Sequence, residues 1–267
     1  MFQEFFELEN PQGLKIKGQY FVPGGFGPYA TVLFCHGFTG NYREKQNMVF
    51  LQELARSGIL AVGFDFTNEA NSSSDGDFFN LTLDSEMSDV NAVLDFIKKN
   101  PYVDHKSIGL CGHSLGGIVA TKLAADRNHE IKALATISSL WNPKEELTLI
   151  LEIAITIWKR QGYLDFARMT PEWGVGDKRL GYGFYESVSK YDPEETIRKI
   201  GMPTLVMHGE DDDTILVSSG HKLFDELKGD KTLKIIEKGD HIFSDPESLK
   251  EASKTLSEWF SQKLDRR

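Results

Sequence analysis

The strongest constraint on the fold is a regular alternation between short apolar runs and segments with helical spacing of apolar residues. Runs that are apolar throughout are typical of strands in a parallel sheet, because helices then cover both of its faces. We therefore expect an α/β protein. The expected strands are 14–22, 30–35, 59–66, 107–111, 131–138, 203–208 and 232–237, and the expected helices are 46–57, 83–99, 114–127, 218–228 and 246–263.

The alternation breaks between residues 142 and 196, where no clear strand is expected and only residues 145–159 have helical spacing. An irregular stretch of this length in a compact domain is usually functional or disordered. Its many aromatic residues argue against disorder. We therefore expect a core of residues 1–141 and 197–267 and an inserted cap, or lid, of residues 142–196. The aromatic residues of the insertion are Trp158, Tyr163, Phe166, Trp173, Tyr182, Phe184, Tyr185 and Tyr191.

The charge balance and the cysteine count argue against several classes of protein. With 40 acidic and 30 basic residues, the net charge of −10 repels nucleic acid and anionic membranes. The two cysteines, Cys35 and Cys111, are too few for a disulfide scaffold. No apolar run approaches the roughly 20 residues of a membrane-spanning helix, and the first residues are acidic where a signal peptide is basic. We expect a cytoplasmic protein with reduced thiols that binds neither nucleic acid nor membranes.

Residues 112–116 read Gly-His-Ser-Leu-Gly and fit the G-x-S-x-G pattern of a nucleophilic serine. An expected strand precedes this segment and an expected helix follows it, which is the context that the pattern requires. Small residues are needed beside such a serine, because its turn is sharp and other chain segments pass close to it. The helix N-terminus adds positive potential beneath a developing oxyanion. Ser114 is therefore the candidate nucleophile.

A serine hydroxyl needs a base to accept its proton, and the base needs an acid to orient it. After a nucleophile on a strand-to-helix turn, the acid and then the histidine follow along the chain. His241 follows an expected strand and so lies at the carboxyl edge of the sheet, where parallel sheets collect their sites. The acid is expected within residues 209–214. Its distance from the strand end favours Asp212 and leaves Asp213 as the alternative.

Two backbone N–H groups are expected to bind the oxyanion of an acyl-transfer reaction. One belongs to Leu115, which follows the nucleophile, and the other comes from the loop after strand 30–35, where Phe38 is the candidate. His36 and His113 lie beside these residues, but we expect both to be buried, hydrogen-bonded structural side chains. The sequence predicts no metal site, because no second set of oxygen ligands accompanies the acidic residues 210–213.

Four motifs, taken in order, resemble those of the α/β-hydrolase superfamily along nearly the whole chain. They are His36-Gly37-Phe38, Gly-His-Ser-Leu-Gly-Gly at 112–117, His208-Gly209-x-x-Asp212 and Gly239-Asp240-His241. Within the superfamily, the chain most resembles the bacterial feruloyl/cinnamoyl esterase group. That second resemblance comes from residues 64–66, 74–76 and 240–245, the helix with Glu86 and Asp89, and the place of the insertion.

The resemblance implies an α/β-hydrolase fold, with a mostly parallel eight-stranded sheet flanked by helices and an inserted cap over an acyl or aromatic pocket. It implies Ser114 as nucleophile, His241 as base, Asp212 as orienting acid, and Phe38 and Leu115 as oxyanion donors. In the feruloyl/cinnamoyl group a tyrosine of the lid binds the phenolic end of the substrate. Tyr185 stands close to that position.

These observations predict a serine carboxylesterase that hydrolyses small to medium acyl or aryl esters, including hydroxycinnamoyl esters, through an acyl-enzyme. The expected partner is a small-molecule ester, and no cofactor is expected. A thioesterase, an amidase or a peptidase-like hydrolase of the same fold is an alternative, since one triad serves all of these reactions. A binding protein without turnover is a further alternative, because fold does not fix function. The apolar cap helix could also face a second subunit in a homodimer.

Overall fold

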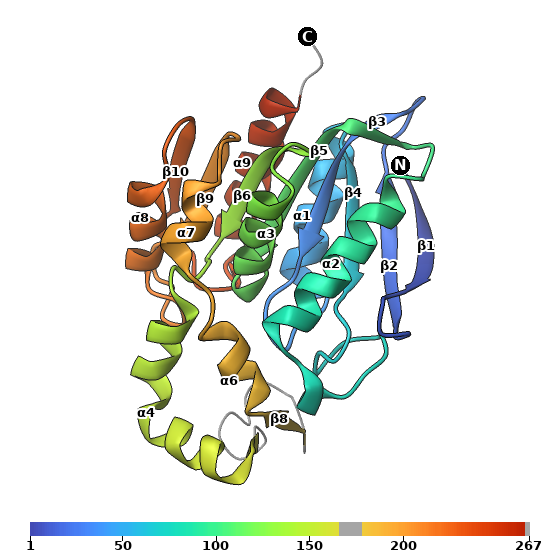
Figure 1. The fold of residues 1–267 in the computed structure, drawn as a ribbon. Helices are drawn as coiled ribbons and strands as arrows, with labels where there is room; N and C mark the ends of the chain where they lie inside the picture. Colours follow the sequence, from blue (N-terminus) through green and yellow to red (C-terminus); the bar gives the residue numbers. More distant parts are fainter. Residues whose placement is uncertain (166–177, 265–267) are drawn as a thin grey trace.

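The computed structural model describes residues 1–165 and 178–264, and within 148–153 it describes the backbone alone. Most strands of this part of the chain form one eight-stranded sheet (Figure 1). In spatial order its strands are β1 (Phe2–Glu9), β2 (Lys15–Val22), β4 (Leu60–Asp65), β3 (Tyr29–Cys35), β5 (Val103–His113), β6 (Ile131–Ile137), β9 (Thr204–Gly209) and β10 (Lys231–Ile236).

The sheet is mostly parallel, as predicted. β2 pairs antiparallel with β1 and with β4, whereas all the other neighbouring pairs are parallel. The candidate residues Ser114, Asp212 and His241 follow β5, β9 and β10, respectively. Because the carboxyl ends of parallel strands meet at one edge of a sheet, this topology brings three distant segments of the chain together.

Helices cover both faces of the sheet, and alternate residues of each central strand point to opposite faces. In β3, Leu33 and Cys35 join the apolar cluster beneath α2, α3 and α8, while Val32 and Phe34 join the cluster beneath α1 and α9. Figure 1 shows the two layers on either side of the sheet. The helices are α1 (Lys45–Arg56), the 3₁₀ helix η1 (Phe78–Asn80), α2 (Leu83–Ile97), α3 (Leu115–Asp126), α8 (Val217–Glu226) and α9 (Pro246–Lys263).

The segment between β6 and β9 projects from the sheet, and its long helix α4 extends away from the core (Figure 1). It contains α4 (Pro143–Gln161), the strand pair β7 (Tyr163–Asp165) and β8 (Arg179–Gly181), α6 (Gly183–Val188) and α7 (Pro193–Arg198). Trp158 anchors α4 to β8, since its side chain is buried and its Nε1 donates to the carbonyl of Leu180 at 2.9 Å. The cap boundary that we expect at residue 196 falls inside α7. Two of the expected cap aromatics, Phe166 and Trp173, lie outside the described residues.

The structure differs from the sequence-based expectations in several places, which include the short helices α6 and α7 of the insertion, where we expect only residues 145–159 to be helical. The N-terminal strand β1 was not expected; it lies at the sheet edge, where most of its residues are exposed and no continuous apolar run arises. The insertion contains the β7–β8 pair, although no strand was expected there, because strands of three residues are too short for a periodic pattern. β5 begins at Val103, earlier than expected, and includes polar residues that are exposed.

Candidate active site

Ser114 lies on a strained turn between β5 and α3. Its backbone has φ of +54° and ψ of −124°, a conformation that non-glycine residues rarely adopt. The turn is possible because its neighbours lack side chains. A Cβ on Gly116 would lie 2.3 Å from the carbonyl oxygens of Cys35 and His36, and a Cβ on Gly112 would lie 2.1 Å from the oxygen of Gly116. The sequence expectation of a sharp turn flanked by required glycines is therefore confirmed.

His241 lies between the hydroxyl of Ser114 and the carboxylate of Asp212. Its Nε2 is 3.1 Å from Ser114 Oγ, and its Nδ1 is 2.8 Å from Asp212 Oδ2. The carboxylate accepts a hydrogen bond, so the proton of a neutral His241 sits on Nδ1, and Nε2 is left to accept the serine proton. These three residues are called the candidate triad below. The structure thus brings together the three residues that the sequence analysis names as nucleophile, base and acid.

Asp212 is held as an ionised acceptor. Its Oδ1 accepts from the backbone N–H groups of Thr214 at 3.0 Å and Ile215 at 2.9 Å, and His208 Nε2 lies 3.3 Å from its Oδ2. Burial alone would raise the pKa of Asp212, but the hydrogen bonds from His208 and His241 outweigh it and hold this pKa well below its usual range. The alternative acid, Asp213, is exposed. The geometry therefore selects Asp212.

The remaining histidines near the site have structural surroundings, as expected. His36 is fully buried; its Nδ1 donates to the carbonyl of Gly37 at 2.9 Å, and its Nε2 accepts from the N–H of Phe66 at 3.1 Å. His113 Nε2 donates to the carbonyl of His241 at 2.8 Å, so it supports the loop of the candidate base. Burial, together with the neighbouring charge of His241, lowers the pKa of His113 to about 3. Both rings are therefore neutral at neutral pH.

The loop after β3 runs directly beside Ser114. A Cβ on Gly37 would lie 3.0 Å from the Cβ of Ser114, so the backbone of this loop borders the nucleophile. Phe38 follows Gly37, and Leu115 is the first residue of α3, whose N–H has no carbonyl partner within the helix. The two candidate oxyanion donors therefore belong to segments that border Ser114. Their role in binding an oxyanion stays a prediction.

The cap meets this loop through aromatic side chains. Phe184 of α6 lies with its ring centre 5.0 Å from that of Phe38. Tyr185, the predicted substrate-binding residue, packs one position further along α6, with its ring 6.1 Å from Trp158 and 5.7 Å from Tyr182. Sequence reasoning did not single out Phe184, although it adjoins Tyr185. Substrate binding by Tyr185 stays a prediction.

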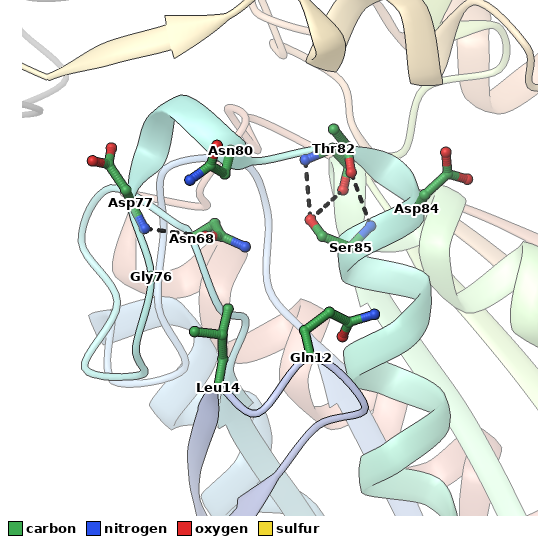
Figure 2. Close-up of a pocket in the computed structure, with 9 residues that line it drawn as sticks. All are labelled: Gln12, Leu14, Asn68, Gly76, Asp77, Asn80, Thr82, Asp84 and Ser85. Carbon is green, nitrogen blue, oxygen red and sulfur yellow. Dashed lines mark hydrogen bonds between the residues drawn. The ribbon is translucent and has the colours of Figure 1, made fainter.

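A separate cavity of about 540 Å³ lies beside the loop between β4 and α2 (Figure 2). Hydrogen bonds within the wall satisfy several of its polar groups. Asn68 Oδ1 accepts from the N–H of Asp77 at 3.0 Å, and Thr82 and Ser85 cap α2 reciprocally. The lining residues, none of which belongs to the candidate triad, are Gln12, Leu14, Asn68, Gly76, Asp77, Asn80, Thr82, Asp84 and Ser85.

Among residues 1–165 and 178–264, no group of three or more His, Cys, Asp or Glu side chains could hold a metal ion. Within the same part of the chain, no helix combines the length and the apolar character that a membrane crossing requires.

Two family models match the chain, and each covers more than half of it. The prolyl oligopeptidase family matches residues 80–267, which include the whole candidate triad. The FrsA-like esterase family matches residues 3–144, which include the loop with Phe38 and the turn with Ser114. The chain belongs to these two hydrolase families. Their overlap spans residues 80–144, so the nucleophile turn is common to both matches.

Individual relatives of this hydrolase are distant. The uncharacterized protein YqkD of Bacillus subtilis is 24% identical over 264 residues, covering 97% of this chain and 80% of YqkD. Esterase FrsA of an Enterobacter species is 30% identical over 131 residues, which is 49% of this chain and 30% of that esterase. The match to FrsA therefore concerns less than a third of that protein.

Solved structures confirm the α/β-hydrolase fold. Est1E from Butyrivibrio proteoclasticus, determined with ferulic acid bound, superposes with a TM-score of 0.79 at 22% identity, covering 98% of this chain and all of that chain. Alpha/beta hydrolase domain-containing protein 10 from mouse superposes with a TM-score of 0.78 at 18% identity, covering 97% of this chain and 99% of that one. The predicted architecture is thus correct for this hydrolase.

Proposed function

We propose that this hydrolase is a serine carboxylesterase that cleaves small to medium acyl or aryl esters through an acyl-enzyme. The observation that carries the proposal is the unbroken chain of contacts from Ser114 Oγ to His241 Nε2, at 3.1 Å, and from His241 Nδ1 to Asp212 Oδ2, at 2.8 Å. Membership of a family of FrsA-like esterases favours an ester over other acyl substrates.

The geometry supports the following sequence of steps. His241 accepts the proton of Ser114 as Oγ attacks the ester carbonyl, and Asp212 stabilises the imidazolium that forms. The N–H groups of Phe38 and Leu115 bind the negative oxygen of the tetrahedral intermediate. His241 then donates its proton to the departing alcohol, which leaves an acyl group on Ser114. A water molecule, deprotonated by His241, releases the acid and restores the serine.

A hydroxycinnamoyl ester is the aryl substrate that we favour. The cap layer around α6 is rich in aromatic rings: Phe184 and Tyr185 each lie against Trp158, and Phe184 also lies against Phe38. Flat aryl groups pack well against such rings. Est1E, which has a similar fold, was determined with ferulic acid bound, and this supports the choice of methyl ferulate as a test substrate.

Peptide hydrolysis is the second candidate function. It is favoured by the match of residues 80–267 to the prolyl oligopeptidase family. A thioester is a third acyl substrate for the same triad, and binding without turnover is the remaining alternative. A fluorophosphonate separates binding from catalysis, because it reacts readily only with an activated serine.

The test is hydrolysis of p-nitrophenyl esters from acetate to laurate, together with methyl ferulate, an acyl thioester and a proline-containing peptide amide. Ser114→Ala serves as the blank. The proposal predicts ester hydrolysis that is lost in the variant, with the highest kcat/KM on a short acyl ester or on ferulate. If the folded protein cleaves only the peptide or the thioester, the carboxylesterase proposal is wrong and the corresponding alternative replaces it. If it cleaves none of them and resists a fluorophosphonate, binding without turnover replaces it.

A further inference from the structure

Glu69, in the loop between β4 and α2, holds the backbone beside the candidate nucleophile. Its Oε2 accepts from the N–H of Thr39 at 2.9 Å and from the N–H of Ala70 at 3.1 Å. Thr39 follows Phe38 directly and has φ of +62°, in the left-handed region that costs a β-branched residue energy. The hydrogen bond to Glu69 therefore stabilises the peptide between Phe38 and Thr39 in a conformation that is unfavourable for a β-branched residue.

The same segment also binds the other side of Thr39 and contacts the cap. Asn71 Nδ2 donates to the carbonyl of Thr39 at 2.7 Å, so both backbone groups of Thr39 are held from residues 69–71. The amine of Lys178, which precedes β8, donates to the carbonyl of Ala70. Residues 69–71 thus connect the loop of the candidate oxyanion donor to the cap.

Glu69 is paired with a second buried acid. Glu86 of α2 is fully buried, Glu69 is 5% exposed, and their carboxyl groups lie within hydrogen-bonding reach of each other. Glu69 Oε1 and both carboxyl oxygens of Glu86 have no other hydrogen-bond donor. A buried carboxyl pair without donors is satisfied when it retains a proton, because one oxygen then donates to its neighbour. The oxygen that accepts two N–H groups belongs to Glu69, so the donated proton sits on Glu86.

The charged groups around the pair do not compensate the negative charge that loss of this proton would leave. The charges that act on the two carboxyl groups are those of Glu44 on Glu69 and of Asp89 on Glu86, and the Cys35 thiol also faces Glu86. Lys178 donates to a backbone carbonyl nearby rather than to either carboxylate. Acidic surroundings favour retention of the proton.

We propose that Glu69 is a positioning residue for the oxyanion loop, and that Glu86 keeps it in place by contributing a shared proton. Glu69 acts on the peptide next to Phe38 and not on the substrate itself. The inference rests on the proposed serine hydrolase function and identifies what holds one half of its oxyanion hole. The polar loop that bears Glu69 is therefore part of the machinery, although it contributes no reacting group.

The direction of the pH dependence follows from burial. Burial raises the pKa values of the two carboxyl groups, Glu69 and Glu86, above their ordinary value of 4.5, and because the groups are in contact they lose their protons as a pair. The folded protein then binds protons that the unfolded chain releases above pH 4.5, so stability falls as pH rises from there into the alkaline range. In the alkaline range the pair loses its last proton, the two carboxylates repel each other, and the loop at Thr39 loosens.

The experiment compares Glu69→Ala, Glu69→Gln, Glu86→Gln and the control Asp89→Asn on the best ester substrate. We expect kcat of Glu69→Ala to fall about 10- to 100-fold with KM changed little, because a displaced oxyanion donor weakens mainly the transition state. Glu69→Gln retains an oxygen for the Thr39 N–H and is expected to recover most of that loss. Asp89→Asn alters another buried carboxyl of α2, one that accepts from Thr67. It is expected to lower the melting temperature and to leave kcat unchanged at pH 7, where burial and Glu69 still raise the pKa of Glu86 without the charge of Asp89.

Glu86→Gln tests the shared proton, since its amide donates to Glu69 at every pH. Its kcat is expected to stay within about threefold of wild type at pH 7, while the loss of activity in the alkaline range becomes smaller. The melting temperature of both proteins is expected to fall between pH 5 and about 8.5. The fall is expected to be smaller in Glu86→Gln than in wild type, by about 5 °C. Alkaline and thermal profiles identical to those of wild type would overturn the shared-proton part.

The positioning part is overturned if Glu69→Ala keeps wild-type kcat, or if Asp89→Asn loses as much kcat as Glu69→Ala does. Hydrogen exchange gives a readout that needs no turnover: Glu69→Ala should expose the amides of residues 38–40 more than Asp89→Asn does. If wild type cleaves no ester, the proposed function fails by itself. Amide exchange and the melting profile of Glu86→Gln then decide the inference separately.

Discussion

The ring of Phe184 lies 5.0 Å from the ring of Phe38, so the cap contacts the loop that borders Ser114. Phe184 is buried in the described structure, and its ring also stacks on Trp158, the anchor of α4. Through this contact, a shift of the cap can move the loop that borders Ser114. A change in the cap at Phe184 can therefore alter the position of Phe38 and, under the proposed function, the shape of the acyl site.

Phe184→Leu should change substrate preference more than it changes stability. The smaller side chain opens space against Phe38, so we expect the optimum of the p-nitrophenyl series to move to longer acyl chains and KM for methyl ferulate to rise about 3- to 10-fold. Phe260→Leu is the matched control, because Phe260 is also buried but lies in α9 on the opposite face of the sheet. An unchanged chain-length profile in Phe184→Leu would show that Phe184 does not shape the acyl site.

Asp212→Asn should reduce kcat about 10³- to 10⁴-fold, because the neutral side chain no longer stabilises a charged His241 or fixes its tautomer. Asp213→Asn, the neighbouring and exposed alternative, should keep wild-type kcat. Steady-state kinetics on the best ester compares the two variants. Equal losses in both would contradict the assignment of the acid.

The same pair of variants tests the depressed pKa of Asp212. Because this pKa lies below its ordinary value of 3.8 in the folded protein, the carboxylate stabilises the fold above that pH, and the contribution disappears as pH falls further. In urea unfolding, Asp212→Asn should therefore lose about 1–3 kcal/mol at pH 7, and the deficit should shrink below pH 3.8. A deficit that does not depend on pH would indicate a packing effect instead.

Gly116→Ala should damage the turn at Ser114, since the new Cβ would lie 2.3 Å from two backbone carbonyl oxygens of the β3 end. Neither oxygen can move without shifting the loop that carries Phe38. We expect a loss of at least about 2 kcal/mol in unfolding free energy and a fall in kcat of about 100-fold or more. Gly201→Ala is the control, because nothing lies within 4 Å of its new Cβ. Denaturant unfolding and steady-state kinetics compare the two variants. Equal unfolding free energies and equal kcat values would contradict this account of the turn.

The sequence predicted the parts of the site that depend on chain order and strand ends. Ser114, Asp212 and His241 each follow a strand whose apolar character marks it as buried, and a parallel sheet must bring such ends together. Glycines at 112 and 116 mark the turn for the same reason, since the close approach of other segments is a property of the backbone.

Other parts could not be predicted because they depend on packing between distant segments. The contact of Phe184 with Phe38 arises from the docking of the cap, and nothing in the spacing of the insertion distinguishes Phe184 from Tyr185. Glu69 lies in a polar loop and would normally be read as exposed. Its burial beside Glu86 requires the loop to fold beneath the cap, and helical spacing indicates only that Glu86 faces inward.

The most direct test of the central claim is a measurement of where a fluorophosphonate reacts. The intact protein and its His241→Ala and Asp212→Asn variants are treated with the reagent, and the modified residue is located by mass spectrometry of peptides. The account predicts one adduct per chain, on Ser114, formed at least about 100-fold more slowly in both variants. An adduct on another residue, no adduct on the folded protein, or equal rates in all three proteins would contradict it.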